Sequence, residues 1–414
     1  MKLNFFDKTF QVSIGTLLLL ISALGFFLRL YNLEIVGLWM DEIHSTVGTD
    51  PDKTIREVME YCKQDQPPVF FLLLHEWFKV LGYNDFSGRL FAVLAGCLGI
   101  PAMYFLGKEF KNSKVGLISA FITAINYFHV DHSRQIRFYP LVFLFSTLSY
   151  LFFIRVIKEK RPIDFLLYTL STAALLNTHY FGLVVFVSQF ILFVFIIFWK
   201  KMNDLKFVGN AFLAGTIAAL SFAHWLPVVL SDLKIPQFHV QQVTWYFPIQ
   251  FYYIYFRDAV TCMLCAALSF LFLREVFLRI KAKSTRIEDV ILIGWVGLGF
   301  LIPLLYSLIR MPMLEYKYTF ILIPGILAMV ALGLETDLTN NFRFLKPNRF
   351  KLYVIGMLFF AFSVNALFIR TIYFVRTPWQ QWREVTREVM KMDSENQIVF
   401  AEYAWYFRYY FKIY

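Results

Sequence analysis

The chain has 414 residues, of which 58% are hydrophobic, 49 are Phe and 23 are Tyr, and its mean hydropathy is +0.57. So much apolar sequence excludes an ordinary soluble domain and indicates a protein that crosses a membrane many times. The formal charge of +11 does not indicate nucleic-acid binding, because the basic residues fall in short clusters between apolar segments, as they do in the loops of membrane proteins.

Apolar runs of roughly 17 to 25 residues predict membrane-spanning helices, and about eleven of them follow one another along the chain. The first has no small-residue cleavage site, so we interpret it as a retained helix and not as a signal peptide. The two runs on either side of Thr178 to Phe181 are short and would also fit tilted helices that enter the membrane only partly. The predicted spans are Val12–Leu30, Phe86–Leu106, Val115–Val130, Phe138–Ile157, Ile163–Asn177, Gly182–Trp199, Phe207–Val228, Ala259–Leu278, Ile287–Ile309, Tyr318–Leu334 and Leu352–Val375. The sequence therefore predicts an all-α, polytopic membrane protein.

Lysine and arginine residues gather in alternate loops, which by the positive-inside rule face the cytoplasm. These loops contain Lys108, Lys111, Lys114, Arg155, Lys158, Lys160, Arg161, Lys200, Lys201, Lys206, Arg279, Lys281, Lys283, Arg286, Arg343, Lys346, Arg349 and Lys351. The opposite short loops hold only scattered basic residues, such as Arg134, Arg137, Lys234, Arg310 and Lys317. We therefore expect a membrane domain over 1–376 with its N-terminus in the cytoplasm. The first loop (31–85) and a short C-terminal segment (377–414) would lie on the outer side.

The long first outer loop is predicted to have helices of its own. The stretch from Asp50 to Glu60 favours one helix. The apolar run Val69–Leu81 is interrupted by charged residues, so it predicts an interfacial helix that lies on the membrane and ends at Gly82. In the C-terminal segment we expect a helix over Trp382–Met392 and a strand over Gln397–Ala401, in a unit too small to have a hydrophobic core of its own.

Two adjacent carboxylates, Asp41 and Glu42, lie in the first outer loop just after the first predicted helix. One interpretation is a solvated loop in which the acidic pair begins a short helix that runs through Thr46. The other is catalytic, because acidic side chains at a membrane surface need water, a partner or a function. A carboxylate there can take a proton from an acceptor hydroxyl. Such a dipeptide is a weak motif by itself, so its neighbours must decide between the two interpretations.

The unusual ionisable residues all fall on the predicted outer side. They are Asp41, Glu42, Asp131, His132, Arg134, Arg137, His179, His224, His239, Tyr316, Lys317 and Tyr318. An enzyme that moves a sugar from a polyprenyl phosphate needs three things at this surface: a carboxylate to deprotonate the acceptor, cations to hold the departing phosphate, and an apolar groove for the prenyl tail. The sequence offers all three on one face.

Several short motifs follow one another in an order that resembles a known family. They are Trp39-Met40-Asp41-Glu42, Gln66-Pro67-Pro68 with the helix to Gly82, Arg89, Ser133-Arg134-Gln135-Ile136-Arg137-Phe138-Tyr139, Thr178-His179-Tyr180-Phe181-Gly182, Tyr316-Lys317-Tyr318-Thr319-Phe320 with Pro324, and Trp379-Gln380-Gln381-Trp382-Arg383. Over nearly the whole chain this order resembles the GT-C glycosyltransferases, in the branch similar to protein O-mannosyltransferases that includes bacterial lipopolysaccharide-core and lipid A aminoarabinose transferases. Gln66 departs from the His or Lys that is frequent in the family, and the C-terminal segment is shorter.

The resemblance implies an inverting glycosyltransferase at the outer face of the cytoplasmic membrane, with a polyprenyl-phosphate-linked sugar as donor and a lipid, glycan or protein as acceptor. It implies that Asp41 is the general base and that Glu42 orients it or the sugar. The donor-phosphate-binding residues would be Arg137, Lys317 and Arg134. The other substrate-binding residues would be Gln66, His179, Tyr180, Tyr316 and Tyr318.

These residues also have structural interpretations. Arg137 fits a snorkelling anchor at the membrane edge, and Lys317 between two tyrosines fits an aromatic belt. We favour phosphate binding for Arg137, because its loop faces outward and Arg134 lies three residues away, on the same face if the segment is helical. His179 would be structural if neighbouring groups satisfy its ring nitrogens.

The acidic residues of the outer loops lack the spacing of metal ligands, and the four cysteines form no metal-binding or disulfide pattern, so we expect neither a metal nor a cofactor. The alternative function is a transporter or flippase of a lipid-linked saccharide, which would place charged groups near the bilayer midplane beside broken helices. The sequence shows neither that placement nor an internal repeat. A non-catalytic subunit with the same fold would not need Asp41.

Overall fold

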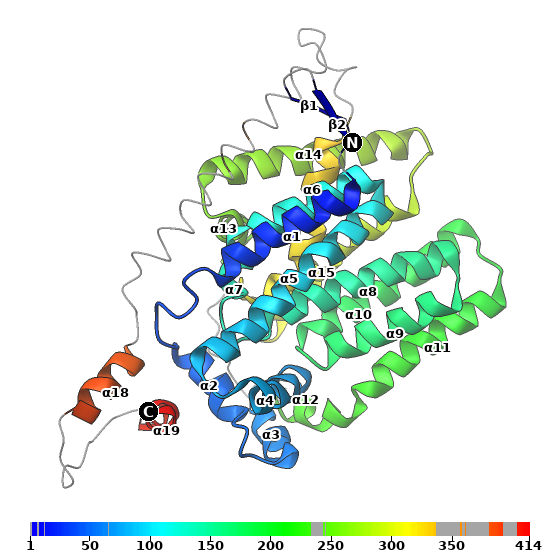
Figure 1. Cartoon of the computed structure of the whole chain (residues 1–414). Coiled ribbons are helices and arrows are strands. Elements are labelled where there is room, and N and C mark those ends of the chain that lie inside the picture. Colours follow the sequence, from blue (N-terminus) through cyan, green and yellow to red (C-terminus); the bar gives the residue numbers. More distant parts are fainter. Residues whose placement is uncertain are drawn as a thin grey trace.

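The computed structural model describes residues 2–5, 8–11, 13–64, 66–232, 243–244, 246–336, 357, 361, 381–391 and 404–414. These residues form a bundle of helices (Figure 1), preceded by an antiparallel hairpin of two short strands, β1 (Lys2–Phe5) and β2 (Lys8–Gln11). The helices are α1 (Ile14–Leu30), α2 (Met40–Gly48), α3 (Ile55–Cys62), α4 (Val69–Leu81), α5 (Asp85–Phe110), α6 (Ser113–Ile125), α7 (Tyr127–His132), α8 (Tyr139–Glu159), α9 (Pro162–Leu176), α10 (Phe181–Lys200), α11 (Leu205–Ser221), η1 (Ala223–Trp225), α12 (Leu226–Asp232), α13 (Phe247–Phe256), α14 (Ala259–Lys281), α15 (Ile287–Ile309), η2 (Tyr318–Leu322), α16 (Ile323–Leu334), α18 (Trp382–Lys391) and α19 (Ala404–Ile413).

Six of the described helices are long and apolar enough to cross a membrane, and they are α5, α8, α10, the segment from α11 to α12, α14 and α15. Four shorter apolar segments, α1, α6, α9 and η2–α16, match further predicted spans. The predicted helical, polytopic fold is thus confirmed, with the β1–β2 hairpin as an addition. The predicted number of spans is not confirmed, because the run Leu352–Val375 lies outside the described residues except for Met357 and Ala361.

The predicted span Val115–Val130 is interrupted at Asn126. This residue leaves the helical conformation, with φ −62° and ψ 121°, and its side chain accepts a hydrogen bond from the backbone N–H of His129 at 2.9 Å. It therefore ends α6 and caps the short helix α7. The break carries the chain out of the bundle and into the loop that contains Arg134 and Arg137.

The loop 31–85, which is predicted to lie on the outer side, forms three helices, α2, α3 and α4, at one end of the bundle (Figure 1). The prediction for α4 is confirmed, since it spans Val69–Leu81 and ends at Gly82 with φ 87°. The helix expected from Asp50 begins later. Thr54 caps α3, because its hydroxyl accepts from the backbone N–H of Glu57 while the Glu57 carboxylate accepts from the backbone N–H of Thr54.

The loops predicted to face the cytoplasm are tied together by ion pairs. Arg155 pairs with Glu109 at 2.9 Å and Lys158 pairs with Glu288 at 2.8 Å. Arg286 donates to the carbonyl oxygen of Phe110 at 3.2 Å. These contacts join the C-terminal ends of α5 and α8 to the N-terminal end of α15. The basic loops therefore gather at the end of the bundle away from α2.

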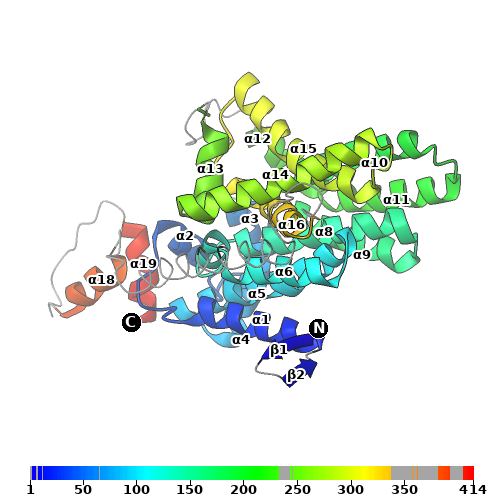
Figure 2. The same ribbon diagram turned by 90° about the horizontal axis from the view of Figure 1, so that it is seen from above.

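The last helix, α19, packs against α2 at the opposite end (Figure 2). Its Tyr409 donates to the Asp85 carboxylate at 2.7 Å, and its Tyr410 hydroxyl accepts from the backbone N–H of Leu38 at 2.7 Å. Lys412 donates to the carboxylate of Asp50 at 2.6 Å. The C-terminal helix therefore holds the loop that leads into Asp41.

A test of sidedness follows from this arrangement and the positive-inside rule. A cysteine introduced at Lys391, which is exposed in α18, is expected to react in intact cells with a thiol reagent that cannot cross the cytoplasmic membrane. A cysteine at Lys281, which is exposed at the end of α14, is expected to react only after the cells are lysed. The wild-type chain with its native cysteines sets the background. The reverse pattern would place Asp41 in the cytoplasm.

Candidate active site

Asp41 lies in the first turn of α2 and is partly exposed. Its backbone carbonyl accepts from the Ser45 hydroxyl at 3.0 Å and from Arg137 Nη1 at 3.2 Å. Its carboxylate accepts no hydrogen bond from the residues that the structure describes. Both oxygens of this carboxylate, at the N-terminal end of α2, are therefore available to a substrate.

Glu42, the next residue, is buried, and both of its carboxylate oxygens accept hydrogen bonds. Arg89 donates to it from Nε at 2.9 Å and from Nη2 at 2.8 Å. The backbone N–H groups of Ile136 and Trp39 donate to the same carboxylate at 3.0 and 3.2 Å. Glu42 thus joins α2 to α5 and to the loop after α7. These bonds fit a role in orienting Asp41 and leave no free position for a sugar.

Arg137 comes from the loop between α7 and α8 and reaches α2. The residue is 6% exposed. It donates to the Ser45 hydroxyl at 3.0 Å as well as to the Asp41 carbonyl, and it lies over the Phe138 ring at 4.5 Å. A buried guanidinium is a strong anchor for an anionic substrate group.

Arg134 points elsewhere. It donates to the carbonyl oxygens of Arg29, Tyr31 and Asn32 at 2.6 to 2.8 Å, and so it caps the C-terminal end of α1. The segment 133–138 is a turn and not a helix, which is why Arg134 and Arg137 do not share a face. These contacts of Arg134 do not support its predicted role in donor binding.

The loop before η2 brings Lys317 to the site together with a carboxylate that the sequence prediction missed. Lys317 Nζ lies 3.4 Å from Glu315 Oε1. Burial raises the pKa of Glu315, Lys317 opposes this shift, and the charge of Asp41 adds to it. Asp41 and Glu315 are therefore close enough for their charges to interact. The signal in the sequence was an acidic residue next to the Tyr316-Lys317-Tyr318 motif.

His179 lies between α9 and α10, where it is 2% exposed. Its ring packs against Phe138 at 4.9 Å and Tyr318 at 5.4 Å. The backbone N–H of Phe181 donates to Nδ1 at 3.0 Å. Burial and the positive charges of Arg137 and Lys317 lower the pKa of His179 to about 3, so the ring is neutral at physiological pH.

Three other predicted substrate-binding residues have different surroundings. Gln66 accepts from the backbone N–H of Tyr180 at 3.3 Å, and so it links the first outer loop to the start of α10. The Tyr180 hydroxyl donates to Asp232 at 2.8 Å, which turns it toward α12. Tyr316 is 38% exposed and touches the Phe128 ring, and it is open to a bound molecule.

The structure thus brings Asp41, Arg137, Glu315, Lys317 and His179 together from four separate parts of the chain. Within the described residues no group of three or more His, Cys, Asp or Glu side chains could hold a metal ion. The site therefore combines two carboxylates, two cations and aromatic walls, which suits proton abstraction next to a bound phosphate.

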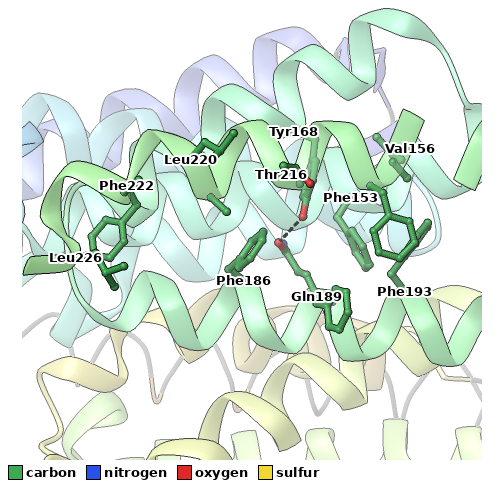
Figure 3. Close-up of a pocket in the computed structure, with 16 residues that line it drawn as sticks. Phe153, Val156, Tyr168, Phe186, Gln189, Phe193, Thr216, Leu220, Phe222 and Leu226 are labelled. Carbon is green, nitrogen blue, oxygen red and sulfur yellow. Dashed lines mark hydrogen bonds between the residues drawn. The ribbon is translucent and has the colours of Figure 1, made fainter. Parts of the chain in front are cut away.

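An apolar cavity of about 390 Å³ lies between α8, α9, α10 and α11 (Figure 3). Phenylalanine rings line it, and the Tyr168 hydroxyl donates to Gln189 Oε1 at 3.2 Å in its wall. It is separate from Asp41.

Comparisons with known proteins identify the fold. Residues 65–227 match the model of the dolichyl-phosphate-mannose-protein mannosyltransferase family. A dolichyl-phosphooligosaccharide-protein glycotransferase 1 of Pyrococcus horikoshii is 26% identical over 175 residues, which are 39% of this chain and 18% of that relative.

Two solved structures match at low identity. One is the oligosaccharyltransferase AglB of Archaeoglobus fulgidus, in complex with an inhibitory peptide and a dolichol-phosphate, with a TM-score of 0.61 at 10% identity, covering 92% of this chain and 58% of AglB. The other is ArnT of Cupriavidus metallidurans bound to undecaprenyl phosphate, with a TM-score of 0.61 at 11% identity, covering 96% of this chain and 85% of ArnT. The chain thus spans little more than half of AglB and about a fifth of the curated relative. These likenesses show that the chain shares its fold with AglB and ArnT, and that residues 65–227 are similar to the dolichyl-phosphate-mannose-protein mannosyltransferase family.

Proposed function

We propose that this protein is an inverting glycosyltransferase that moves a sugar from a polyprenyl-phosphate-linked donor to a lipid, glycan or protein acceptor at the outer face of the cytoplasmic membrane. The observation that carries the proposal is the Asp41 carboxylate, which accepts no hydrogen bond from the described residues while Arg137 lies directly beside its backbone. The predicted outer position of the loop 31–85 supports a reaction at the outer face of the membrane.

In the proposed reaction Asp41 takes the proton of the acceptor hydroxyl, and the acceptor oxygen forms a bond to the anomeric carbon of the sugar. The bond between that carbon and the phosphate oxygen breaks, and its electron pair leaves with the polyprenyl phosphate. Arg137 and Lys317 stabilise the negative charge that develops on the phosphate. A single attack from the face opposite the phosphate inverts the anomeric configuration.

The apolar cavity supports a lipid-linked donor, because its volume and its phenylalanine lining suit part of a prenyl chain. The prenyl phosphates in the AglB and ArnT structures support the same class of donor. A transporter or flippase is less well supported, because the charged groups gather at one end of the bundle and not at its centre. The proposal is tested by incubating the purified chain in lipid nanodiscs with polyprenyl-phosphate sugars and measuring sugar release.

Replacing Arg137 tests the phosphate site. Arg137→Ala is expected to weaken the binding of a polyprenyl phosphate by about 10- to 150-fold, since a hydrogen bond to a charged group contributes about 1.5 to 3 kcal/mol. Arg137→Lys is expected to be damaging as well, because an ammonium cannot form two parallel bonds to phosphate oxygens. The binding constant is measured by titration in nanodiscs.

The matched control is the same pair of substitutions at Arg56, which is exposed on α3 at the same end of the molecule. These variants are expected to bind like the wild type. If Arg137→Ala also binds like the wild type, the phosphate site lies elsewhere and Lys317 becomes the residue to test.

A further inference from the structure

Two buried hydrogen-bond donors beside the site have no partner within the part of the chain that the structure describes. They are the Tyr139 hydroxyl and Nε2 of His179, and both side chains are 2% exposed. A buried polar group left without a partner costs about 1 to 3 kcal/mol. Such groups persist in a folded protein where a function or a bound molecule satisfies them.

The proton on His179 is at Nε2. Its Nδ1 accepts from the backbone N–H of Phe181 at 3.0 Å and so carries no hydrogen. Because the pKa of this ring is lowered to about 3, the imidazole is neutral and its one hydrogen must lie on Nε2. His179 therefore presents a neutral N–H donor, and Tyr139 presents a neutral O–H donor.

Both donors lie between the same two segments of the chain. The ring of Phe138 contacts Tyr139 at 4.7 Å and His179 at 4.9 Å. On the opposite side, Tyr318 contacts His179 at 5.4 Å and Phe320 stacks on Tyr139 at 5.6 Å. These two segments also carry Arg137 and Lys317.

The charges around the donors favour an anion. The positive charges of Arg137 and Lys317 act on His179. The Tyr139 hydroxyl interacts with the positive charge of Arg137 and with the negative charges of Asp41 and Glu315. Two unsatisfied donors beside two cations can bind the oxygens of an anion, whereas Asp41 and Glu315 would repel that anion and hold it on the side of the cations.

We propose that Tyr139 and His179 donate hydrogen bonds to the phosphate oxygens of a polyprenyl phosphate held by Arg137 and Lys317. This inference rests on the proposed function and adds two neutral donors to its phosphate site. As the bond between the sugar and the phosphate breaks, negative charge grows on the phosphate oxygens. Donors fixed in a buried position stabilise this charge without having to reorient.

The test compares ligand binding with the stability of the ligand-free protein. The full chain in nanodiscs is titrated with undecaprenyl phosphate and, separately, with undecaprenol, which lacks the phosphate. Tyr139→Phe is expected to bind undecaprenyl phosphate about 10-fold more weakly and undecaprenol like the wild type. The melting temperature of ligand-free Tyr139→Phe should equal or exceed that of the wild type, because the variant removes a buried hydroxyl without a partner.

Tyr150→Phe is the matched control, because Tyr150 is a buried tyrosine of the same helix that stacks on Trp295 at 3.8 Å. It is expected to leave the affinity for undecaprenyl phosphate unchanged. At the second donor, His179→Ala should weaken this affinity, and His179→Gln should restore part of it through its amide N–H. The Gln variant shows whether the Ala variant loses affinity because the N–H donor is absent or because the packing around His179 is lost.

The outcomes distinguish this inference from the proposed function. If the wild type binds undecaprenyl phosphate and Tyr139→Phe binds it equally well, the inference is wrong while the proposed function stands. A lower melting temperature with unchanged binding would show that the hydroxyl only stabilises the fold. If the wild type binds undecaprenyl phosphate no better than undecaprenol, the proposed function itself fails.

Discussion

Asp41→Asn is expected to lower the rate of sugar transfer by about 100-fold or more and to leave the affinity for the donor close to that of the wild type. The substitution keeps the shape of the side chain but removes the group that accepts the proton. Asp41 contacts Arg137 and Ser45 through its backbone carbonyl, so the amide variant preserves these bonds and the start of α2. The measurement is single-turnover transfer from a polyprenyl-phosphate sugar, with donor binding determined in parallel.

Asp52→Asn is the control for this experiment. Asp52 lies in the same outer loop, and its side chain is 80% exposed. This variant is expected to transfer sugar at the wild-type rate. Near-normal turnover by Asp41→Asn would rule out Asp41 as the base and would direct attention to Glu315, the other carboxylate of the site.

The sequence allowed the prediction of the helical fold. Long apolar runs separated by basic clusters carry that information locally, so each helix can be predicted without knowledge of its neighbours. The break at Asn126 was missed, because a single capping residue inside an apolar run does not change the hydropathy. Helix α19 was also missed, because its many aromatic residues are not typical of either a helix or a strand.

The sequence predicted only some of the residues that come together at the candidate site. Asp41, Arg137 and Lys317 stood out as charged residues in outer loops, and each lies where the structure brings the loops together. Their surroundings depend on packing between distant segments. The pairing of Glu42 with Arg89 joins residues from different helices, and the turn at 133–138 separates Arg134 from Arg137. Spacing along the sequence does not contain this information.

Glu315 and Tyr139 show the same limit in another way. Neither was predicted as a site residue, although both lie within or next to the motifs that suggested the function. Tyr139 is significant because its buried hydroxyl has no partner among the described residues, and Glu315 because it lies near Lys317 and Asp41. Both are properties of the folded chain. The electrostatic interactions of Tyr139 with Asp41 and Glu315 connect the two residues to the same site.

The ion pair between Arg89 and Glu42 is expected to be the largest single contribution to the stability of the outer loop. Arg89→Met is predicted to lower the free energy of unfolding by about 3 to 5 kcal/mol, because it leaves the Glu42 carboxylate buried without its cation. Arg89 also donates to the carbonyl oxygens of Leu33, Val36 and Gly37 at 2.7 to 3.1 Å. The substitution therefore releases the segment that leads into α2, and sugar transfer should fall together with stability.

A double substitution separates these two effects. Glu42→Leu combined with Arg89→Met removes both charges, and replacing a buried ion pair by apolar residues is often close to neutral. The double variant should regain part of the lost stability but not all of it, because the carbonyl oxygens of Leu33, Val36 and Gly37 still lack their donor. Arg155→Met, which breaks a more exposed ion pair with Glu109 at the other end of the bundle, should cost about 1 kcal/mol or less. Chemical unfolding in detergent micelles measures all three variants, and a loss below about 1 kcal/mol for Arg89→Met would contradict the structural role assigned to the pair.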